Sequence, residues 1–355
     1  MSQMAAVVVK DGHIENVHID IPTPAPGQVL VKSLACGICG SDLHIARHAD
    51  EVADIYDKLG VMSKEAMASA PMMLGHEFCA EVVSYGDNTP QRFAPGTRVT
   101  CVPMLMSMGG AGVGVTPGIH GAYSEYFIVD EQLLLAVPDN LPSVGAAITE
   151  PMAVGMHAVN RAGIDKDCVA LVAGCGAIGL ATIAALKHMG VTEIVASDLQ
   201  AKNRDIALQF GASHSVDAAI EDEVALAAKI ADGRRVVIFE CIGVHQLING
   251  FIERAPAHST LVITGIHTAM TQVNFGFATV KEMDIKFSYY YTPEEFAQSL
   301  ELLAGGDVPW EKMCTATVGM DGVSHAFDTL LGKHDHIKVV IEPWRPGAMA
   351  PFENN

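Results

Sequence analysis

Basic side chains are scarce in this chain. Among its 355 residues, 22 Lys and Arg stand against 41 Asp and Glu, which gives a formal net charge of −19. A protein that binds nucleic acid or an anionic membrane needs a basic surface to neutralise phosphates. The composition therefore argues against both kinds of partner, and the excess of acidic residues is typical of a cytoplasmic enzyme.

Long apolar segments are absent too. No apolar run reaches the roughly 18 residues that a membrane-spanning helix needs. The opening MSQMAAVVVKDGHIENVHI lacks a basic segment followed by an apolar one, so we expect no signal peptide. The eight cysteines are scattered along the chain and do not resemble the framework of a small disulfide-rich protein. Together these absences predict a cytoplasmic location.

What is present indicates a globular protein of two domains. Half of the residues are hydrophobic and 18% are charged, and 355 residues exceed what one ordinary core serves. Up to about residue 150, strand-like runs such as QVLVKSLA and AEVVSY alternate with turns that contain Pro and Gly. From about residue 165, β-branched runs alternate with helical stretches, which is the pattern of parallel βαβ units.

A glycine-rich turn in the second half predicts a dinucleotide site. GCGAIG, residues 174–179, follows an apolar strand and opens a helix, and Asp198 ends the next strand. Gly174 allows a tight turn, Gly176 lets the backbone approach a pyrophosphate, and Gly179 permits close packing of helix on strand. The carboxylate of Asp198 would accept hydrogen bonds from ribose hydroxyls and repel a 2′-phosphate. NAD is therefore favoured over NADP.

Residue types that bind metals gather in the first half. CGICGSDLH, residues 36–44, has a Cys-x-x-Cys spacing that fits a redox pair, half of a metal knuckle, or one ligand beside a second cysteine that only packs. GHE adds His76 and Glu77, and EPMAVGMHAV begins with Glu150. Cysteine, histidine and carboxylate form a plausible set for a catalytic zinc ion with one open position.

Five motifs occur in an order known from one protein family: GICGSDLH, GHE, EPMAVGMHAV, GCGAIG and the closing IKVVIEP. On these motifs the chain resembles the zinc-dependent medium-chain dehydrogenases (alcohol dehydrogenases), especially the sorbitol, butanediol and threonine dehydrogenase branch. The resemblance implies an α/β protein with a GroES-like, β-rich catalytic domain and a Rossmann domain with a doubly wound parallel sheet. We expect the catalytic domain at 1–153 with a helical insertion at about 45–74, the Rossmann domain at 154–295, and a segment 296–355 that returns to the catalytic domain.

The resemblance also assigns the metal ligands. The family's metal cysteine precedes a serine by two residues, which makes Cys39 the ligand and leaves Cys36 to packing. His76 is implied as the second ligand. Glu77 is implied as a ligand or as a neighbouring carboxylate that exchanges with water, and Glu150 stands where polyol-type relatives have a ligand glutamate.

Neighbouring residues acquire implied roles as well. Asp42 would accept the other ring N–H of His76 and so fix its orientation. Ser41 would accept the hydroxyl proton of the substrate and pass it through the nicotinamide ribose to His44, whose pKa near neutrality suits a proton carrier. Val154 and Ile178 would contact the nicotinamide ring.

Two places depart from the usual pattern of the family. Many relatives hold a structural zinc with four closely spaced cysteines, but here residues 101–118 contain Cys101 alone. We therefore expect one catalytic zinc per chain and no structural zinc. The basic residue that usually follows the ribose-binding acid by five positions is replaced by Asn203, and its neighbours Lys202 and Arg204 are the candidates to reach the adenosine ribose.

The expected activity is hydride transfer between a secondary alcohol and NAD, which yields the ketone. Glu150 favours a diol or polyol, whereas Met104, Met106, Met108 and the 45–74 insertion favour an apolar pocket. The relatives form oligomers, so a homodimer or homotetramer is expected. Two alternative functions stay open: a zinc-free quinone or enone reductase of the same fold, and a nucleotide-binding protein without catalysis. A thiol–disulfide function of the two cysteines would leave the neighbouring motifs unexplained.

Overall fold

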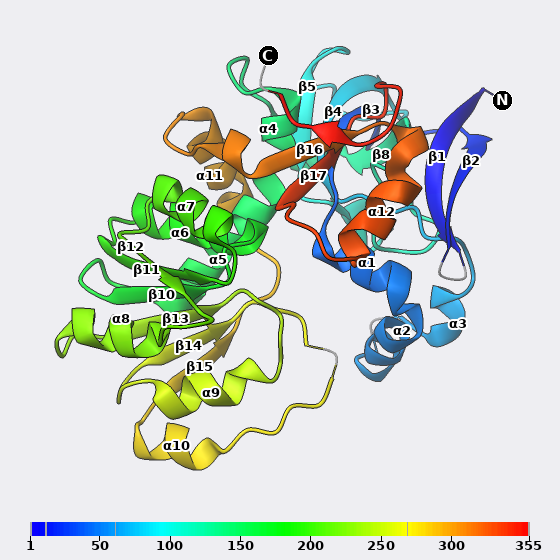
Figure 1. Cartoon of the computed structure of the whole chain (residues 1–355). Coiled ribbons are helices and arrows are strands. Elements are labelled where there is room, and N and C mark those ends of the chain that lie inside the picture. The colour runs from blue at the N-terminus through cyan, green and yellow to red at the C-terminus, as the bar shows by residue number, and fades with distance from the viewer. Residues whose placement is uncertain (1, 11–12, 61, 268, 354–355) are drawn as a thin grey trace. The chain divides into compact units, whose positions relative to one another are not determined.

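The computed structural model describes residues 2–10, 13–60, 62–267 and 269–353 (Figure 1). The chain forms two compact units. The first comprises residues 1–150, 300–306 and 310–355, and the second comprises 151–299 and 307–309. From the sequence we expected the boundaries between the two domains at residues 153/154 and 295/296. Among the described residues, no helix has both the length and the apolar character required to cross a membrane.

The first unit is built on an eight-stranded, mostly antiparallel sheet. Strands follow the order β18-β16-β17-β3-β4-β5-β9, and β8 also pairs with β3. Strands β1 and β2 form a separate two-stranded sheet, and β6 and β7 form a second small pair. The bounds are β1 Gln3–Lys10, β2 His13–Asp20, β3 Gln28–Gly37, β4 Glu77–Tyr85, β5 Arg98–Cys101, β6 Met104–Leu105, β7 Ala111–Gly112, β8 Tyr126–Asp130, β9 Leu134–Ala136, β16 Cys314–Val318, β17 Lys338–Ile341 and β18 Ala350–Pro351.

The C-terminal part of the chain completes this sheet. Strand β17 pairs antiparallel with β3, so that Ile341 lies opposite Cys36, and β16 pairs parallel with β17. Apolar side chains from distant segments, among them Val31, Phe78 and Phe127, are buried in one core. The first unit is therefore not a contiguous piece of sequence, because its sheet needs strands from both ends of the chain.

Helices of the first unit are short. They are α1 Gly40–Arg47, α2 Ala49–Lys58, α3 Lys64–Met67, α4 Ser143–Ala147 and α12 Val323–Leu331. The expected insertion at about 45–74 contains the end of α1, all of α2 and α3. Val52 of α2 is buried, whereas Leu59, just past the end of that helix, is 69% exposed.

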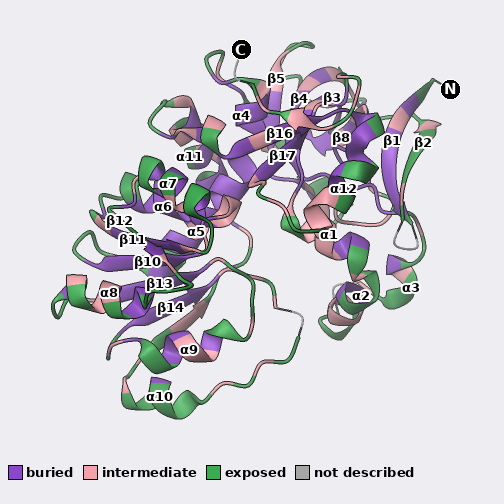
Figure 2. Ribbon diagram, in the orientation of Figure 1, coloured by how far each residue is buried: buried purple, intermediate pink, exposed green. Residues whose placement is uncertain are grey.

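The second unit is a doubly wound Rossmann domain. Its six strands are all parallel, in the order β12-β11-β10-β13-β14-β15. Strands β10 and β13 are buried along their whole length, as expected for a parallel sheet that is covered on both faces, and Figure 2 shows this buried layer in purple. The strands are β10 Val169–Ala173, β11 Glu193–Asp198, β12 His214–Asp217, β13 Val236–Glu240, β14 Thr260–Ile263 and β15 Asp284–Phe287. The helices are α6 Ala177–His188, α7 Ala201–Phe210, α8 Glu223–Ala231, α9 Leu247–Arg254 and α10 Phe275–Val280, while α5 Thr149–Ala162 and α11 Pro293–Ala304 each extend across a boundary of the units.

The strand order reverses between β10 and β13. Connections from β10 lead through β11 to β12 on one side, and from β13 through β14 to β15 on the other. Ligands of doubly wound sheets bind outside the carboxyl ends of the strands at such a reversal. The glycine-rich turn predicted from the sequence follows β10 directly, so it lies at that point.

Helices α5 and α6 pack closely because Gly155 has no side chain. A Cβ atom at Gly155 would lie 2.6 Å from both the carbonyl carbon of Ala181 and the backbone nitrogen of Thr182. At Gly250 of α9, by contrast, the nearest atom would be 4.0 Å away, at the end of Arg254. The two helical glycines therefore provide a matched test of packing.

We expect Gly155→Ala to lower the free energy of unfolding by about 1–3 kcal/mol, because the two helices must separate. Gly250→Ala should raise it by about 0.5–1 kcal/mol, since alanine favours the helix. Urea denaturation of both variants measures the difference. Equal stability of the two variants would contradict the close packing of α5 on α6.

Candidate functional site

Three side chains of metal-binding type meet in the first unit. The ligand atoms of Cys39, His76 and Glu77 all lie within 4.8 Å of one another, and this is the one such group found among the described residues. The pairing of β3 with β4 explains the meeting, because Gly37 at the end of β3 lies opposite Glu77 at the start of β4. Three of the four predicted ligands are thus brought together.

His76 is oriented by its neighbours. Its Nδ1 lies 3.4 Å from Oδ1 of Asp42, and its Nε2 lies 3.5 Å from Oγ of Ser41. Burial lowers the pKa of His76, but the negative charges of Asp42 and Cys39 outweigh burial and raise this pKa well above its ordinary value. The same negative charges would favour a metal cation at the ring. With the hydrogen on Nδ1, facing Asp42, Nε2 is the nitrogen left to bind a metal.

Asp42 is itself held in place from two sides. It is fully buried, and its Oδ2 accepts hydrogen bonds from the hydroxyl of Tyr123 at 2.7 Å and from the backbone N–H of Cys39 at 3.0 Å. The second bond lies at the first turn of α1, where a negative charge is favoured. Cys39 and the carboxylate that orients His76 are therefore fixed by one turn of helix.

Lys338 was missed by the sequence analysis. Its ammonium donates to both carboxylate oxygens of Glu77 at 2.7 Å and to the carbonyl of Ile38 at 3.1 Å. Burial lowers the pKa of Lys338, but the charge of Glu77 outweighs this effect and raises the pKa above its ordinary value. The only sequence signal was the position of Lys338 within the closing IKVVIEP motif.

This ion pair bears on the predicted role of Glu77. Both of its oxygens are engaged by Lys338, whereas Cys39 and His76 have no comparable cationic partner within the described residues. A carboxylate bound to an ammonium is a weaker metal ligand, which suits a group that stands beside the ion or exchanges with water. Direct ligation by Glu77 stays a prediction.

Glu150 is buried at the beginning of α5. It does not belong to the group of three within 4.8 Å. Its charge nevertheless contributes to raising the pKa of Lys338, after the larger effect of Glu77. The negative charge of Glu150 therefore acts on the Lys338–Glu77 ion pair beside the predicted metal site. Ligation of a metal by Glu150 stays a prediction.

Cys36 has the surroundings of a packed thiol. It is fully buried in β3, and burial raises its pKa well above the ordinary value. Metal ligands need the thiolate form, which this environment disfavours. All eight cysteines are described, and all are free thiols.

The residues present fit a zinc ion. A thiol, an imidazole and a carboxylate converge in a largely buried site, and zinc accepts all three donor types. His76 Nδ1 and Asp42 Oδ1 are buried without a hydrogen-bond partner among the described residues, although they lie 3.4 Å apart. These two unpartnered polar atoms fit a ring that faces Asp42 with Nδ1 and leaves Nε2 for an ion.

Ser41 and His44 lie on the same helix, α1. Ser41 is half-buried beside Nε2 of His76. His44 follows one turn later and is half-buried, and burial is the main cause that lowers its pKa. The two predicted proton carriers are thus present on one rigid element, with Ser41 next to the predicted metal-binding atom.

The glycine turn of the second unit has the expected geometry. Gly174 has φ +92°, which favours glycine, and a Cβ atom at Gly179 would lie 1.8 Å from the carbonyl oxygen of Gly174. No atom lies within 4 Å of the Cβ position at Gly176, so the backbone there is open to a ligand. The N-terminus of α6 follows directly and favours an anion such as a pyrophosphate.

Asp198 ends β11 beside that turn. Its carboxylate accepts hydrogen bonds from the backbone N–H groups of Cys175 and Gln200, each at 2.8 Å. Arg204 donates to the backbone carbonyl of Asp198 at 2.9 Å and pairs with the carboxylate of Asp217 at 3.1 Å. Arg204 therefore connects the end of β11 with the end of β12. Its contact with a cofactor stays a prediction.

The remaining predicted contacts with the nicotinamide, Val154 and Ile178, are both half-buried in the second unit, on α5 and α6. Their apolar side chains are partly accessible, as a contact with a flat ring would require. Both assignments stay predictions.

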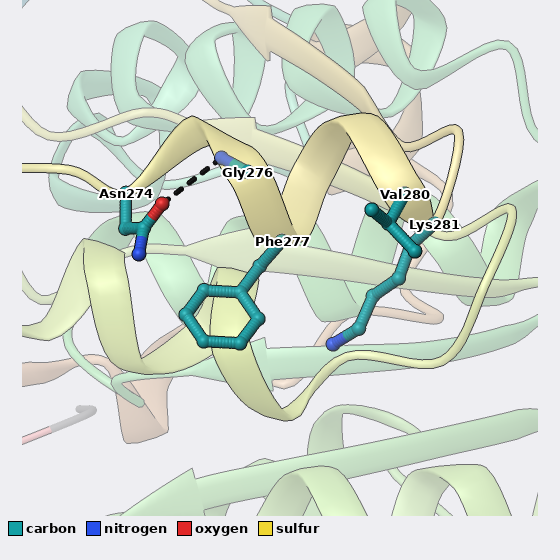
Figure 3. Close-up of a pocket in the computed structure, with 5 residues that line it drawn as sticks. All are labelled: Asn274, Gly276, Phe277, Val280 and Lys281. Carbon is teal, nitrogen blue, oxygen red and sulfur yellow. Dashed lines mark hydrogen bonds between the residues drawn. The ribbon is translucent and has the colours of Figure 1, made fainter.

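A pocket of the second unit has no part in this chemistry. Figure 3 shows it on α10, lined by Asn274, Gly276, Phe277, Val280 and Lys281. Val280 is 87% exposed, and the Lys281 ammonium donates to the backbone carbonyls of α9 at 2.6 and 3.2 Å. The pocket contains none of the predicted site residues.

Comparison with known proteins identifies the family of the chain. The family model of the alcohol dehydrogenase GroES-like domain matches residues 25–139, and that of zinc-binding dehydrogenases matches residues 177–305. The (R,R)-butanediol dehydrogenase of Bacillus subtilis is 32% identical over 345 residues, which cover 94% of this chain and 97% of that protein. The sorbitol dehydrogenase of Bos taurus is 29% identical over 342 residues, or 92% of each chain. The crystal structure of 2R,3R-butanediol dehydrogenase from Bacillus subtilis matches with a TM-score of 0.82 at 31% identity, covering 96% of this chain and 100% of that one.

The ion pair of Lys338 and Glu77 generates a test by double mutation. Lys338→Met should lower the free energy of unfolding by about 3–5 kcal/mol, because it leaves a buried carboxylate without its partner. Adding Glu77→Gln should recover part of that loss. Lys286→Met is the control, since among the described residues the Lys286 ammonium donates to one group, the carbonyl of Ala162, and this substitution should cost about 1 kcal/mol. Additive effects of the two substitutions in urea denaturation would contradict the pairing.

Proposed function

Because the chain belongs to the zinc-dependent medium-chain dehydrogenase family and is an oxidoreductase, we propose that it transfers a hydride between a secondary alcohol and NAD, giving the ketone. The observation that carries the proposal is the meeting of Cys39, His76 and Glu77 beside Ser41. A reductase that needs no metal would have no use for this group of side chains.

The chain's own residues support each part of the reaction. A zinc ion at this site would polarise the alcohol oxygen and lower the pKa of its hydroxyl group. Cys39 and His76 would hold the ion, and Glu150 would be the further predicted ligand. Ser41 Oγ, 3.5 Å from Nε2 of His76, the nitrogen that would bind the metal, is the group that would accept the hydroxyl proton. His44 on the same helix would carry that proton away.

The second unit supports NAD as the hydride acceptor. The diphosphate would bind the turn at Gly174–Gly179 and the N-terminus of α6. Asp198 is held by two backbone N–H groups, so its carboxylate is fixed near the turn and would bind ribose hydroxyls. The same negative charge would repel the 2′-phosphate of NADP.

The substrate is proposed as a secondary alcohol, with a diol or polyol favoured. Two relatives are named for butanediol and sorbitol, which each carry more than one hydroxyl group. Met106 and Met108 are 52% and 51% exposed, so the structure adds no support for an apolar pocket built from them. One zinc per chain, a homo-oligomeric assembly and a cytoplasmic location stay predictions from the sequence.

A panel of secondary alcohols, diols and polyols, assayed by NADH absorbance, tests the proposal. We expect kcat/KM with NAD to exceed that with NADP by at least roughly tenfold, on the order of 1.4 kcal/mol. Asp198→Ala should shrink this preference mainly by weakening the use of NAD. Glu193→Ala, at the opposite end of β11, should leave it unchanged.

Two results would contradict the proposal. Turnover of none of these alcohols, with the metal-loaded protein and either cofactor, would refute the dehydrogenase activity. Equal efficiency with NAD and NADP, or a preference for NADP, would refute the assignment of Asp198.

A further inference from the structure

Two histidines lie in contact at the end of α1. The ring centroids of His44 and His48 are 4.9 Å apart, and the ring planes are inclined by 31°. The backbone N–H of His48 donates to the carbonyl of His44 at 2.7 Å, which fixes the second ring one helical turn beyond the first. The two rings lie partly face to face and share no hydrogen bond among the described residues, so a proton would pass from one imidazole to the other through one bridging water molecule.

The two rings differ in their access to solvent. Nε2 of His44 is buried and has no hydrogen-bond partner among the described residues, whereas the side chain of His48 is 41% exposed. Burial lowers the pKa of His44, the charge of His48 lowers it further, and the charge of Glu51 raises it. A proton is therefore held less firmly on His44 than on an ordinary exposed histidine.

A carboxylate lies next to the outer ring. Oε1 of Glu51, in the first turn of α2, is 3.3 Å from Nδ1 of His48, and its side chain is 56% exposed. Helix α2 follows α1 directly in the chain (Figure 1). The order His44, His48, Glu51 thus runs from a half-buried position to the surface.

We propose that His48 and Glu51 extend the proton path of the alcohol oxidation from His44 to solvent. The proposal rests on the proposed function, because alcohol oxidation is the reaction that delivers a proton to His44. In the transfer an N–H bond of protonated His44 breaks and an N–H bond of His48 forms. The electron pair of the broken bond stays on the His44 nitrogen, and the new bond uses the lone pair of a His48 nitrogen. The proton then passes to the carboxylate of Glu51 or to water. His48 acts through His44 and is a positioning residue of this path.

The substitution His48→Gln tests the path in the zinc-loaded, full-length protein. At pH 7 we expect kcat for alcohol oxidation to fall by roughly tenfold, less than for a direct acid–base catalyst because water substitutes in part. The loss should shrink as pH rises, imidazole in the buffer should restore the rate, and KM should change little. Glu51→Gln should show the same pH dependence with a smaller loss.

His214→Gln provides a matched control. The side chain of His214 is 42% exposed and lies 3.4 Å from Glu193, much as His48 lies beside Glu51. This control should leave kcat and its pH profile unchanged.

If the unmodified protein oxidises alcohols, two results would overturn the proposed proton path. One is a His48→Gln variant whose kcat, pH profile and response to imidazole match the unmodified protein. The other is a loss of activity that imidazole does not repair and that follows a lowered Tm, since that is a structural effect. A lack of alcohol oxidation in the unmodified protein would instead refute the proposed function.

Discussion

Strand β3 ends at Gly37 with a neighbour on either side, Glu77 of β4 and Val340 of β17. The predicted metal site depends on this register. It places Cys39, two residues beyond the strand end, beside the GHE motif, and it brings Lys338 of β17 to the carboxylate of Glu77. A Cβ atom at Gly37 would lie 2.0 Å from that carboxylate, so the site leaves no space for a side chain there.

The charges around the site form a second constraint. Asp42 and Glu77 are buried and each has a defined partner, Tyr123 and the Cys39 N–H for the first and Lys338 for the second. Burying such groups is costly unless hydrogen bonds and opposite charges satisfy them. With Lys338 engaged by Glu77, the buried carboxylate of Asp42 faces the His76 ring and favours a positive charge there. A cation at this point would therefore stabilise the folded protein as well as serve the chemistry.

The sequence predicted those parts of the structure that depend on neighbouring residues. The turn at Gly174–Gly179, the position of Asp198 and the parallel sheet all follow from local patterns, and the convergence of Cys39, His76 and Glu77 followed from a resemblance to a family. Lys338 and Tyr123 were missed because their partners are 261 and 81 residues away along the chain. Such contacts depend on strand register, which periodicity does not determine. Leu59 is exposed because it lies just beyond the end of α2, whereas Val52 within that helix is buried.

We predict that the chain has a single metal site, which depends on Cys39 rather than Cys36. Elemental analysis of protein purified without added metal tests it most directly. We expect about one zinc per chain, loss of that zinc in Cys39→Ala, and its retention in Cys36→Ala. Zinc that is lost from Cys36→Ala and kept by Cys39→Ala, or two tightly held zinc ions per chain, would contradict a single site that depends on Cys39.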